Sequence, residues 1–219
     1  GLTGADALSL HTALDGSAFT ETVPAIVEGV KLIAPDAGSI IEIGSQGSRF
    51  ITNLDTVPQF ATNGHCAGGT GSFFEDQMSR LGLSIEDYSS YTKKASSIPR
   101  LSGRCAVFAK TDIIHRQQEG VSTPDILLGL CYAMIKNYNA TIVKTLPVVK
   151  PVVFCGGVTK NDGVTRAIKD VFALNDNELI IPENSIYAGA LGAALHASGA
   201  FKISDIINAC KKTIHINKN

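Results

Sequence analysis

Hydrophobic residues recur at intervals of three and four along several stretches of the chain, which is the spacing of an amphipathic helix. The clearest stretch covers residues 22–34, and Pro35 follows it directly, so a helix is expected to end there. The same spacing predicts helices over residues 72–81, 106–118, 123–143, 164–172, 186–197 and 203–214, and a weaker one from residue 84. Thr123 and Pro124 mark a strong helix start, because a hydroxyl can cap the first turn and proline fits there. Gly189 and Gly192 lower helix propensity, so a close approach of backbone or ligand is expected at both.

Short apolar runs rich in β-branched residues predict strands over residues 39–43, 49–53, 151–155 and 179–181. A polar turn at residues 44–48 joins the first two runs, which indicates a hairpin. The order along the chain is therefore a hairpin, several helices, and then strand, helix, strand and helix. This order is typical of an α/β domain that binds its ligand at the strand ends.

Three turns that contain glycine lie within this framework. They are Gly-Ser-Gln-Gly-Ser at residues 44–48, Cys-Ala-Gly-Gly-Thr-Gly at 66–71, and Cys-Gly-Gly-Val-Thr-Lys-Asn at 155–161. Glycine lets a backbone approach a phosphate closely, and the helix after the second turn is expected to direct free N–H groups and its positive dipole end at the anion. Gln46 could orient a water molecule. Each turn alone is also explained as a tight turn without a ligand.

Composition narrows the class of protein. The chain has 219 residues, of which 44% are hydrophobic, so it can bury a real core. Its net charge of -1 gives no electrostatic reason to expect nucleic acid or an anionic membrane as partner. No apolar run reaches the roughly 18 residues of a membrane span, and the N-terminus lacks a signal-peptide pattern, so a cytoplasmic location is expected. Five cysteines at irregular spacing fit thiols or metal ligands better than a disulfide framework.

Taken together in this order, the three turns resemble the second half-domain of the RNase H-like nucleotide-binding fold of actin, the 70-kilodalton heat-shock chaperones and sugar kinases. Within that α/β fold, the chain is most similar to the activator family of 2-hydroxyacyl-CoA dehydratases and the related ATPase subunits of benzoyl-CoA reductase. The match extends from about residue 34 to residue 197. It includes Cys-Ala-Val-Phe-Ala at residues 105–109 and Gly-Ala-Leu-Gly-Ala-Ala at residues 189–194.

The resemblance implies an ATP-driven donor of one low-potential electron to a CoA-thioester dehydratase or reductase. In that family, cysteines that match Cys66 and Cys105 hold one 4Fe-4S cluster shared across a homodimer, and thiolates are the ligands such clusters take. Gln46 is the candidate catalytic residue, and ATP or ADP with Mg²⁺ is the expected nucleotide. The expected nucleotide-binding residues are Gly44, Ser45, Gln46, Ser48, Gly68, Gly69, Thr70, Gly71, Gly156, Gly157, Val158 and Asn161. The remaining thiols, Cys131, Cys155 and Cys210, are expected to be structural.

Two departures from the family pattern qualify this expectation. The first phosphate turn of the family is absent, so the chain is interpreted as a module of a longer protein. Residues 1–33 would be an N-terminal remnant with a connecting helix, and residues 34–219 would form the activase half-domain. The second departure is Gly47, where the family usually has an aspartate that helps with magnesium or the attacking water.

Two other functions remain open at this stage. A sugar or acyl kinase half would share the glycine turns, but it needs a catalytic base near the first of them, and Gly47 is not one. A degenerate module that packs against a larger protein without catalysis is favoured by the missing turn and by Gly47.

Overall fold

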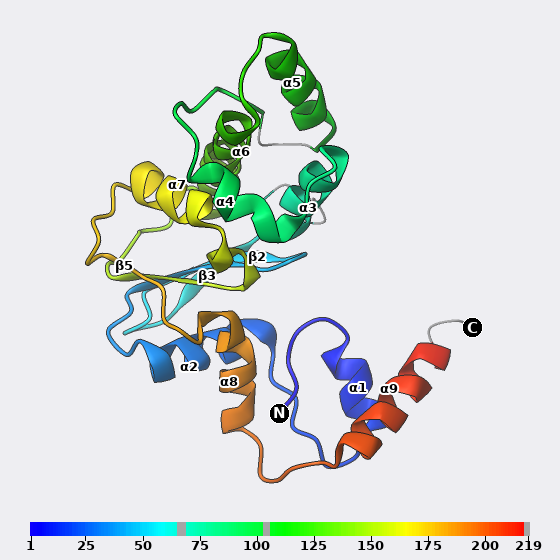
Figure 1. Cartoon of the computed structure of the whole chain (residues 1–219). Helices are drawn as coiled ribbons and strands as arrows, with labels where there is room; N and C mark the ends of the chain where they lie inside the picture. Colours follow the sequence, from blue (N-terminus) through cyan, green and yellow to red (C-terminus); the bar gives the residue numbers. More distant parts are fainter. Residues whose placement is uncertain (65–68, 103–105, 217–219) are drawn as a thin grey trace. The chain divides into compact units, whose positions relative to one another are not determined.

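The computed structural model describes residues 1–64, 69–102 and 106–216. The chain forms two compact units (Figure 1). The larger consists of Asp36–Ile186, and the smaller combines Gly1–Pro35 with Tyr187–Asn219. The sequence led us to expect a boundary after residue 33. The grouping of the C-terminal segment with the N-terminal one was not expected.

A mixed five-stranded sheet with the order β3-β2-β1-β4-β5 forms the centre of the larger unit. β1 pairs antiparallel with β2 and parallel with β4, and all of its residues are buried. The middle strand of a sheet is buried, which explains Ile40, Ile41 and Ile43, while the buried Ser39 and Glu42 have polar partners in Thr52 and Arg49. The strands are β1 (Ser39–Ile43), β2 (Ser48–Thr52), β3 (Gln59–Thr62), β4 (Val152–Cys155) and β5 (Leu179–Ile180).

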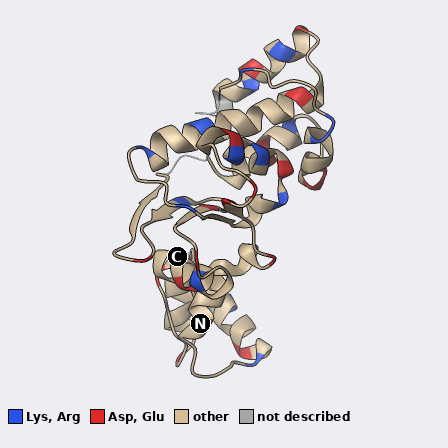
Figure 2. Cartoon of the chain, turned by 90° about the vertical axis from the view of Figure 1, so that its left-hand side faces the viewer, with Lys and Arg blue, Asp and Glu red and all other residues tan. Residues whose placement is uncertain are grey.

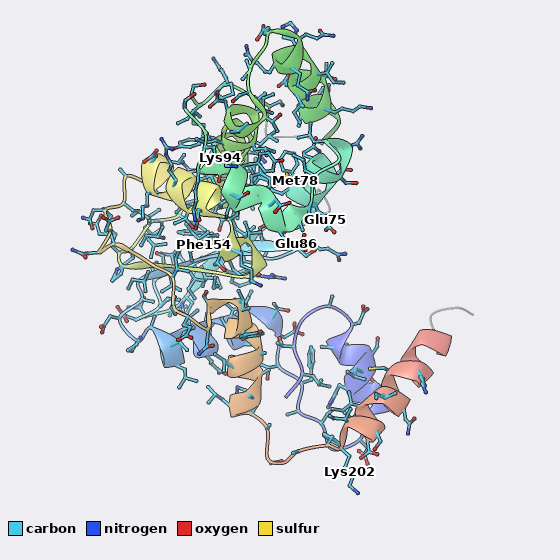
Figure 3. All side chains as sticks on the ribbon, in the orientation of Figure 1. Glu75, Met78, Glu86, Lys94, Phe154 and Lys202 are labelled. Carbon is cyan, nitrogen blue, oxygen red and sulfur yellow. The ribbon has the colours of Figure 1, made fainter. Side chains whose placement is uncertain are left out.

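Helices of the larger unit cover one face of this sheet (Figure 1). Phe154 of β4 is fully buried between the sheet and the helices, and it belongs to the main core cluster (Figure 3). The helical segments are α3 (Gly71–Arg80), η1 (Ile85–Asp87), α4 (Tyr88–Thr92), α5 (Ala106–Gln118), α6 (Thr123–Tyr138), η2 (Asn139–Val143), η3 (Gly157–Lys160) and α7 (Asp162–Phe172).

The helical stretch Thr123–Val143 has the length and apolar composition of a membrane span, which was not expected from the sequence, yet 67% of an apolar 18-residue part of it is buried inside the protein. It is therefore the central core helix of the larger unit. The hydroxyl that caps α6 belongs to Ser122, one residue before the predicted Thr123. Its oxygen accepts a hydrogen bond from the N–H of Asp125. Charged residues of both signs are interspersed over the helices of this unit (Figure 2).

The smaller unit contains α1 (Ala7–Ala13), α2 (Thr22–Ile33), α8 (Ala188–Leu195) and α9 (Ile203–Ile216), and η4 (Ser185–Tyr187) leads into it. α2 and α8 cross at very short range. A Cβ atom on Gly192 would lie 1.8 Å from the carbonyl oxygen of Ala25, so only glycine fits there. The predicted close approach is confirmed for Gly192. It is wrong for Gly189, where a Cβ atom would make only an ordinary contact at 3.7 Å.

Candidate functional site

Two of the three glycine turns meet where the parallel strands β1 and β4 end. The turn at residues 44–47 follows β1, and Gly156 follows β4 at the same edge of the sheet. Gly156 has a φ of 92°, and a Cβ atom on it would lie 2.4 Å from the carbonyl oxygen of Ile43. Any side chain would therefore push the two turns apart, so glycine is required at this position.

The second turn, at residues 66–71, is joined to the first by backbone hydrogen bonds. The N–H of Gly71 donates to the carbonyl of Gly44 and the N–H of Ser72 to that of Ser45, both at 2.8 Å. The N–H of Phe73 donates to the carbonyl of Thr70 at 3.2 Å. These amides at the start of α3 are thus already used within the protein. The expectation that they are free for an anion is wrong for these three groups.

Ser48 and Thr70 are both buried and act inside the protein. The Ser48 hydroxyl donates to the carbonyl of Gly69, and its N–H donates to the Asn63 side chain at 2.8 Å. The Thr70 and Ser72 hydroxyls are 2.9 Å apart. These bonds hold the second turn in place, so Ser48 and Thr70 act as positioning residues of that turn.

A cavity of about 330 Å³ opens where the three turns converge. Small-molecule sites have volumes of roughly 300–1,000 Å³, so the volume of this cavity is near the lower limit of that range. One wall is apolar, and its Phe74 and Tyr88 rings meet edge to face at 5.0 Å. The Tyr88 hydroxyl donates to the carbonyl of Leu127, which fixes the ring. The lining residues are Ser45, Gly71, Phe74, Glu75, Ile85, Glu86, Tyr88, Gly157, Val158, Lys160 and Asn161.

The rim of this cavity carries both signs of charge. Glu75 comes from α3 and Glu86 from η1, and both line the cavity (Figure 3). A hydrogen bond from the Ser84 hydroxyl lowers the pKa of the Glu86 carboxyl, so this residue is ionised at neutral pH. The exposed Lys160 supplies a cation. Lys160 lies within the third glycine turn, but its role at the rim was not expected from the sequence.

Backbone N–H groups without a partner are available at two of the turns. Within the described ranges, no hydrogen-bond acceptor is seen for the N–H of Ser45, Gln46, Gly157 or Val158. Clustered free amides of this kind bind anions. Gln46 is exposed at the tip of the first turn and is not among the cavity-lining residues.

Asn161 lies in the cavity wall, but its side-chain oxygen is already used. It accepts the N–H groups of Gly163 and Val164 at 3.0 and 3.3 Å, and so caps α7. The Cys131 thiol lies 3.8 Å from the same oxygen, and burial raises its pKa to about 12. Cys131 is therefore a buried thiol, as predicted. Only the amide nitrogen of Asn161 remains for a ligand.

An ion pair that sequence analysis missed lies next to the first turn. Glu42 and Arg49 face each other across the hairpin, with Oε2 and Nη1 2.8 Å apart. Burial raises the pKa of the Glu42 carboxyl, and the Arg49 guanidinium partly offsets this. A Cβ atom on Gly47 would lie 3.1 Å from Nη1 of Arg49, and one on Gly44 would lie 3.1 Å from Oε1 of Glu42. The predicted turn at 44–48 is one residue longer than the observed one, because β2 begins at Ser48, so counting register from the sequence would have placed Glu42 opposite Phe50.

Three predicted site residues, Cys66, Gly68 and Cys105, lie outside the described residues. Within the part of the chain that is described, no group of three or more His, Cys, Asp or Glu side chains could hold a metal ion. Cys131 and Cys155 are fully buried, and burial raises the pKa of each thiol. Both thiols therefore stay protonated at neutral pH and are unreactive.

Comparison with known proteins gives one consistent family. The profile of the BadF/BadG/BcrA/BcrD ATPase family matches residues 1–197. The activator of lactoyl-CoA dehydratase from Anaerotignum propionicum is 33% identical over 172 residues, which cover 78% of this chain and 65% of that protein. The chain thus spans just under two thirds of the length of this curated relative.

Two solved structures are similar over most of the chain. Component A of (R)-2-hydroxyglutaryl-CoA dehydratase from Acidaminococcus fermentans superposes with a TM-score of 0.80 at 27% identity, covering 95% of this chain and 75% of that one. The activator of 2-hydroxyisocaproyl-CoA dehydratase from Clostridium difficile, with bound ADPNP, gives 0.75 at 27% identity, covering 90% and 70%. The predicted α/β fold of the actin, heat-shock chaperone and sugar-kinase type is confirmed.

Proposed function

The chain belongs to the BadF/BadG/BcrA/BcrD ATPase family, and from that premise we propose that it is an ATP-dependent activase module of a cytoplasmic protein. It donates a low-potential electron from a 4Fe-4S cluster to a CoA-thioester dehydratase or a benzoyl-CoA reductase type of partner. The observation that carries the proposal is the convergence of three glycine turns on one cavity at the strand ends. A fold of this type binds its ligand there.

Residues at the turns are proposed to bind different parts of ATP. Free N–H groups of Ser45 and Gln46 meet the phosphates, which need donors that no other group uses. Val158 and the apolar wall at Phe74 pack against the adenine. Lys160 at the rim attracts the negatively charged phosphates. Gln46, exposed at the tip of its turn, orients the attacking water.

The cluster part of the proposal rests on thiol chemistry and on the sequence. A bound cluster supplies the one-electron reduction. Cys66 and Cys105 are the proposed ligands because they match the cluster cysteines of the family that the chain resembles, and thiolates are the ligands such clusters take. In the family that the chain resembles, each of two identical subunits gives two thiolates to one shared cluster. A homodimer is therefore part of the proposal.

A second candidate function is a degenerate module that binds nucleotide weakly or not at all. One observation favours it. Gly47 stands where the family usually has an aspartate, and the Arg49 guanidinium lies close to the space that the aspartate side chain would enter. An aspartate there would compete with Glu42 for the same cation. The turn of this chain is thus built without that carboxylate.

The test is an anaerobic preparation of the chain, assayed for iron, sulfide and an electron paramagnetic resonance signal. The proposal predicts iron and sulfide that disappear in Cys66→Ala and in Cys105→Ala but persist in Cys210→Ala, the matched control. A full cluster in either of the first two variants contradicts it. Calorimetry with MgADP and MgATP separates the second candidate, for which weak binding or none is expected.

A further inference from the structure

A second cavity lies in the larger unit, apart from the three turns. It is formed between α6 and the segment at residues 96–102, which has neither helix nor strand structure, and its volume is about 530 Å³. This volume is well inside the range of small-molecule sites, roughly 300–1,000 Å³. It shares no lining residue with the cavity at the glycine turns.

Carboxylates hold the wall of this cavity at both ends. One oxygen of Asp125 accepts the N–H groups of Ser96 and Ser97, each at 2.7 Å. At the other end, Asp112 accepts the N–H of Ser102 at 2.7 Å. Hydrogen bonds to charged groups are stronger than neutral ones, so the segment is fixed without a ligand.

The wall also lies directly against α6 at one point. A Cβ atom on Gly129 would be 2.6 Å from the carbonyl oxygen of Pro99, so glycine lets the segment touch the helix there. Toward the C-terminal end of α6, Lys136 and Asn137 line the cavity between the helix and the segment. The cavity is therefore preformed, which reduces the entropic cost of binding.

The charge of this cavity is positive. Arg100 and Lys136 line it and no acidic residue does, although the whole chain has a net charge of -1. Within the described part of the chain, neither of the two side chains has an ion pair or a hydrogen bond. The Asn137 amide adds a further polar group, whereas the Tyr132 hydroxyl is already bonded to Asp170.

Part of the lining is apolar. Ile98 and Leu101 come from the segment and Ala133 comes from α6, whereas Ser102 and Asn137 are polar. A ligand that uses both the cations and these apolar side chains combines an anionic group with an apolar body. We propose that the cavity binds a small organic anion in which a phosphate or a carboxylate is joined to such a body. This inference does not depend on the proposed activase function.

The test uses three probes on the ¹⁵N-labelled chain: phenyl phosphate, benzoate and neutral benzyl alcohol. We expect one or both anions to shift the amide signals of Leu101, Ala133 and Asn137 saturably, and benzyl alcohol to leave them unchanged. The two anionic probes distinguish a phosphate from a carboxylate ligand. Inorganic phosphate is titrated as well, since equal affinity for it would mean an adventitious ion only and would overturn the proposal.

Variants then test the role of charge. Arg100→Gln and Lys136→Gln should each weaken binding of the anionic probe about tenfold, because each removes one charge-assisted hydrogen bond. Both residues are exposed, so the fold is expected to survive, and the spectrum of each variant checks this. Lys202→Gln, in the smaller unit, is the matched control and should change nothing (Figure 3). Unchanged affinity in both cavity variants, or probe-induced shifts confined to Ser45 and Gly157, would overturn the proposal.

Discussion

The Arg49 guanidinium donates to the Glu42 carboxylate at 2.8 Å across the β1–β2 hairpin, next to the turn proposed to hold phosphate. Both side chains are largely buried, with 24% and 12% of their surface exposed. A buried charge is costly unless it is paired, so each partner stabilises the other. The pair also supports the backbone of Gly44 and Gly47, against which the two side chains lie.

This pair predicts a specific dependence of stability on pH. Burial raises the folded-state pKa of Glu42 above its ordinary value of 4.5, so the folded form binds the proton more tightly than the unfolded form. The resulting stabilisation is fully present below the unfolded pKa and is lost as pH rises through the folded pKa. The Glu42→Gln variant lacks this titrating group, so its free energy of unfolding should not show this decrease with rising pH. Urea unfolding of both proteins between about pH 4 and pH 7 measures the difference, and parallel curves would count against it.

Gly156 and Gly157, which follow β4, should respond differently to substitution by alanine. Gly156→Ala places a Cβ atom 2.4 Å from the Ile43 carbonyl at a φ of 92°, so it should lower the free energy of unfolding by at least about 2 kcal/mol. Gly157→Ala meets nothing within 4 Å and should leave stability nearly unchanged. Because Gly157 lines the cavity, this second variant should still weaken MgADP binding. Urea unfolding and calorimetry on both variants check this, and intact MgADP affinity in Gly157→Ala would contradict it.

Asn161 is predicted to contribute mainly as the cap of α7. Asn161→Ala should cost about 1 kcal/mol of unfolding free energy, whereas Asn161→Asp should keep most of it, because aspartate also caps helices well. Denaturant unfolding measures both. Equal losses in the two variants would show that the amide nitrogen, not the capping oxygen, is the important group.

In the smaller unit, two glycines of α8 provide another matched pair. Gly192→Ala would place a Cβ atom 1.8 Å from the Ala25 carbonyl, so it should separate α2 from α8 and sharply increase amide exchange in both helices. Gly189→Ala has room at 3.7 Å and should stabilise α8 by up to about 1 kcal/mol through helix propensity. Hydrogen exchange followed by mass spectrometry reads out each helix. Similar exchange in the two variants would contradict the tight crossing.

The sequence was sufficient for most of the long elements, since their burial imposes a regular pattern. α2 and α6 were predicted from apolar spacing, and β1 from its continuous apolar run. β3 and α1 were missed. β3 is short and mostly exposed, and α1 has one buried residue, so neither leaves a pattern of burial in the sequence.

The candidate site was predictable only in part, because glycines mark turns but not what the turns touch. The three turns were identified, yet the bonds from Gly71 to Gly44 and from Ser72 to Ser45 depend on how the elements pack. The cavity wall from η1 and α4 could not be foreseen either, since Ile85 and Tyr88 carry no local signal for a ligand.

The central claim is that the three turns form one nucleotide site, and an amide spectrum recorded during a MgADP titration tests it most directly. The account predicts that the signals of Ser45, Gly71 and Gly157 shift together with one dissociation constant. If MgADP leaves these signals unchanged, or shifts only one turn, the turns do not form a common nucleotide site.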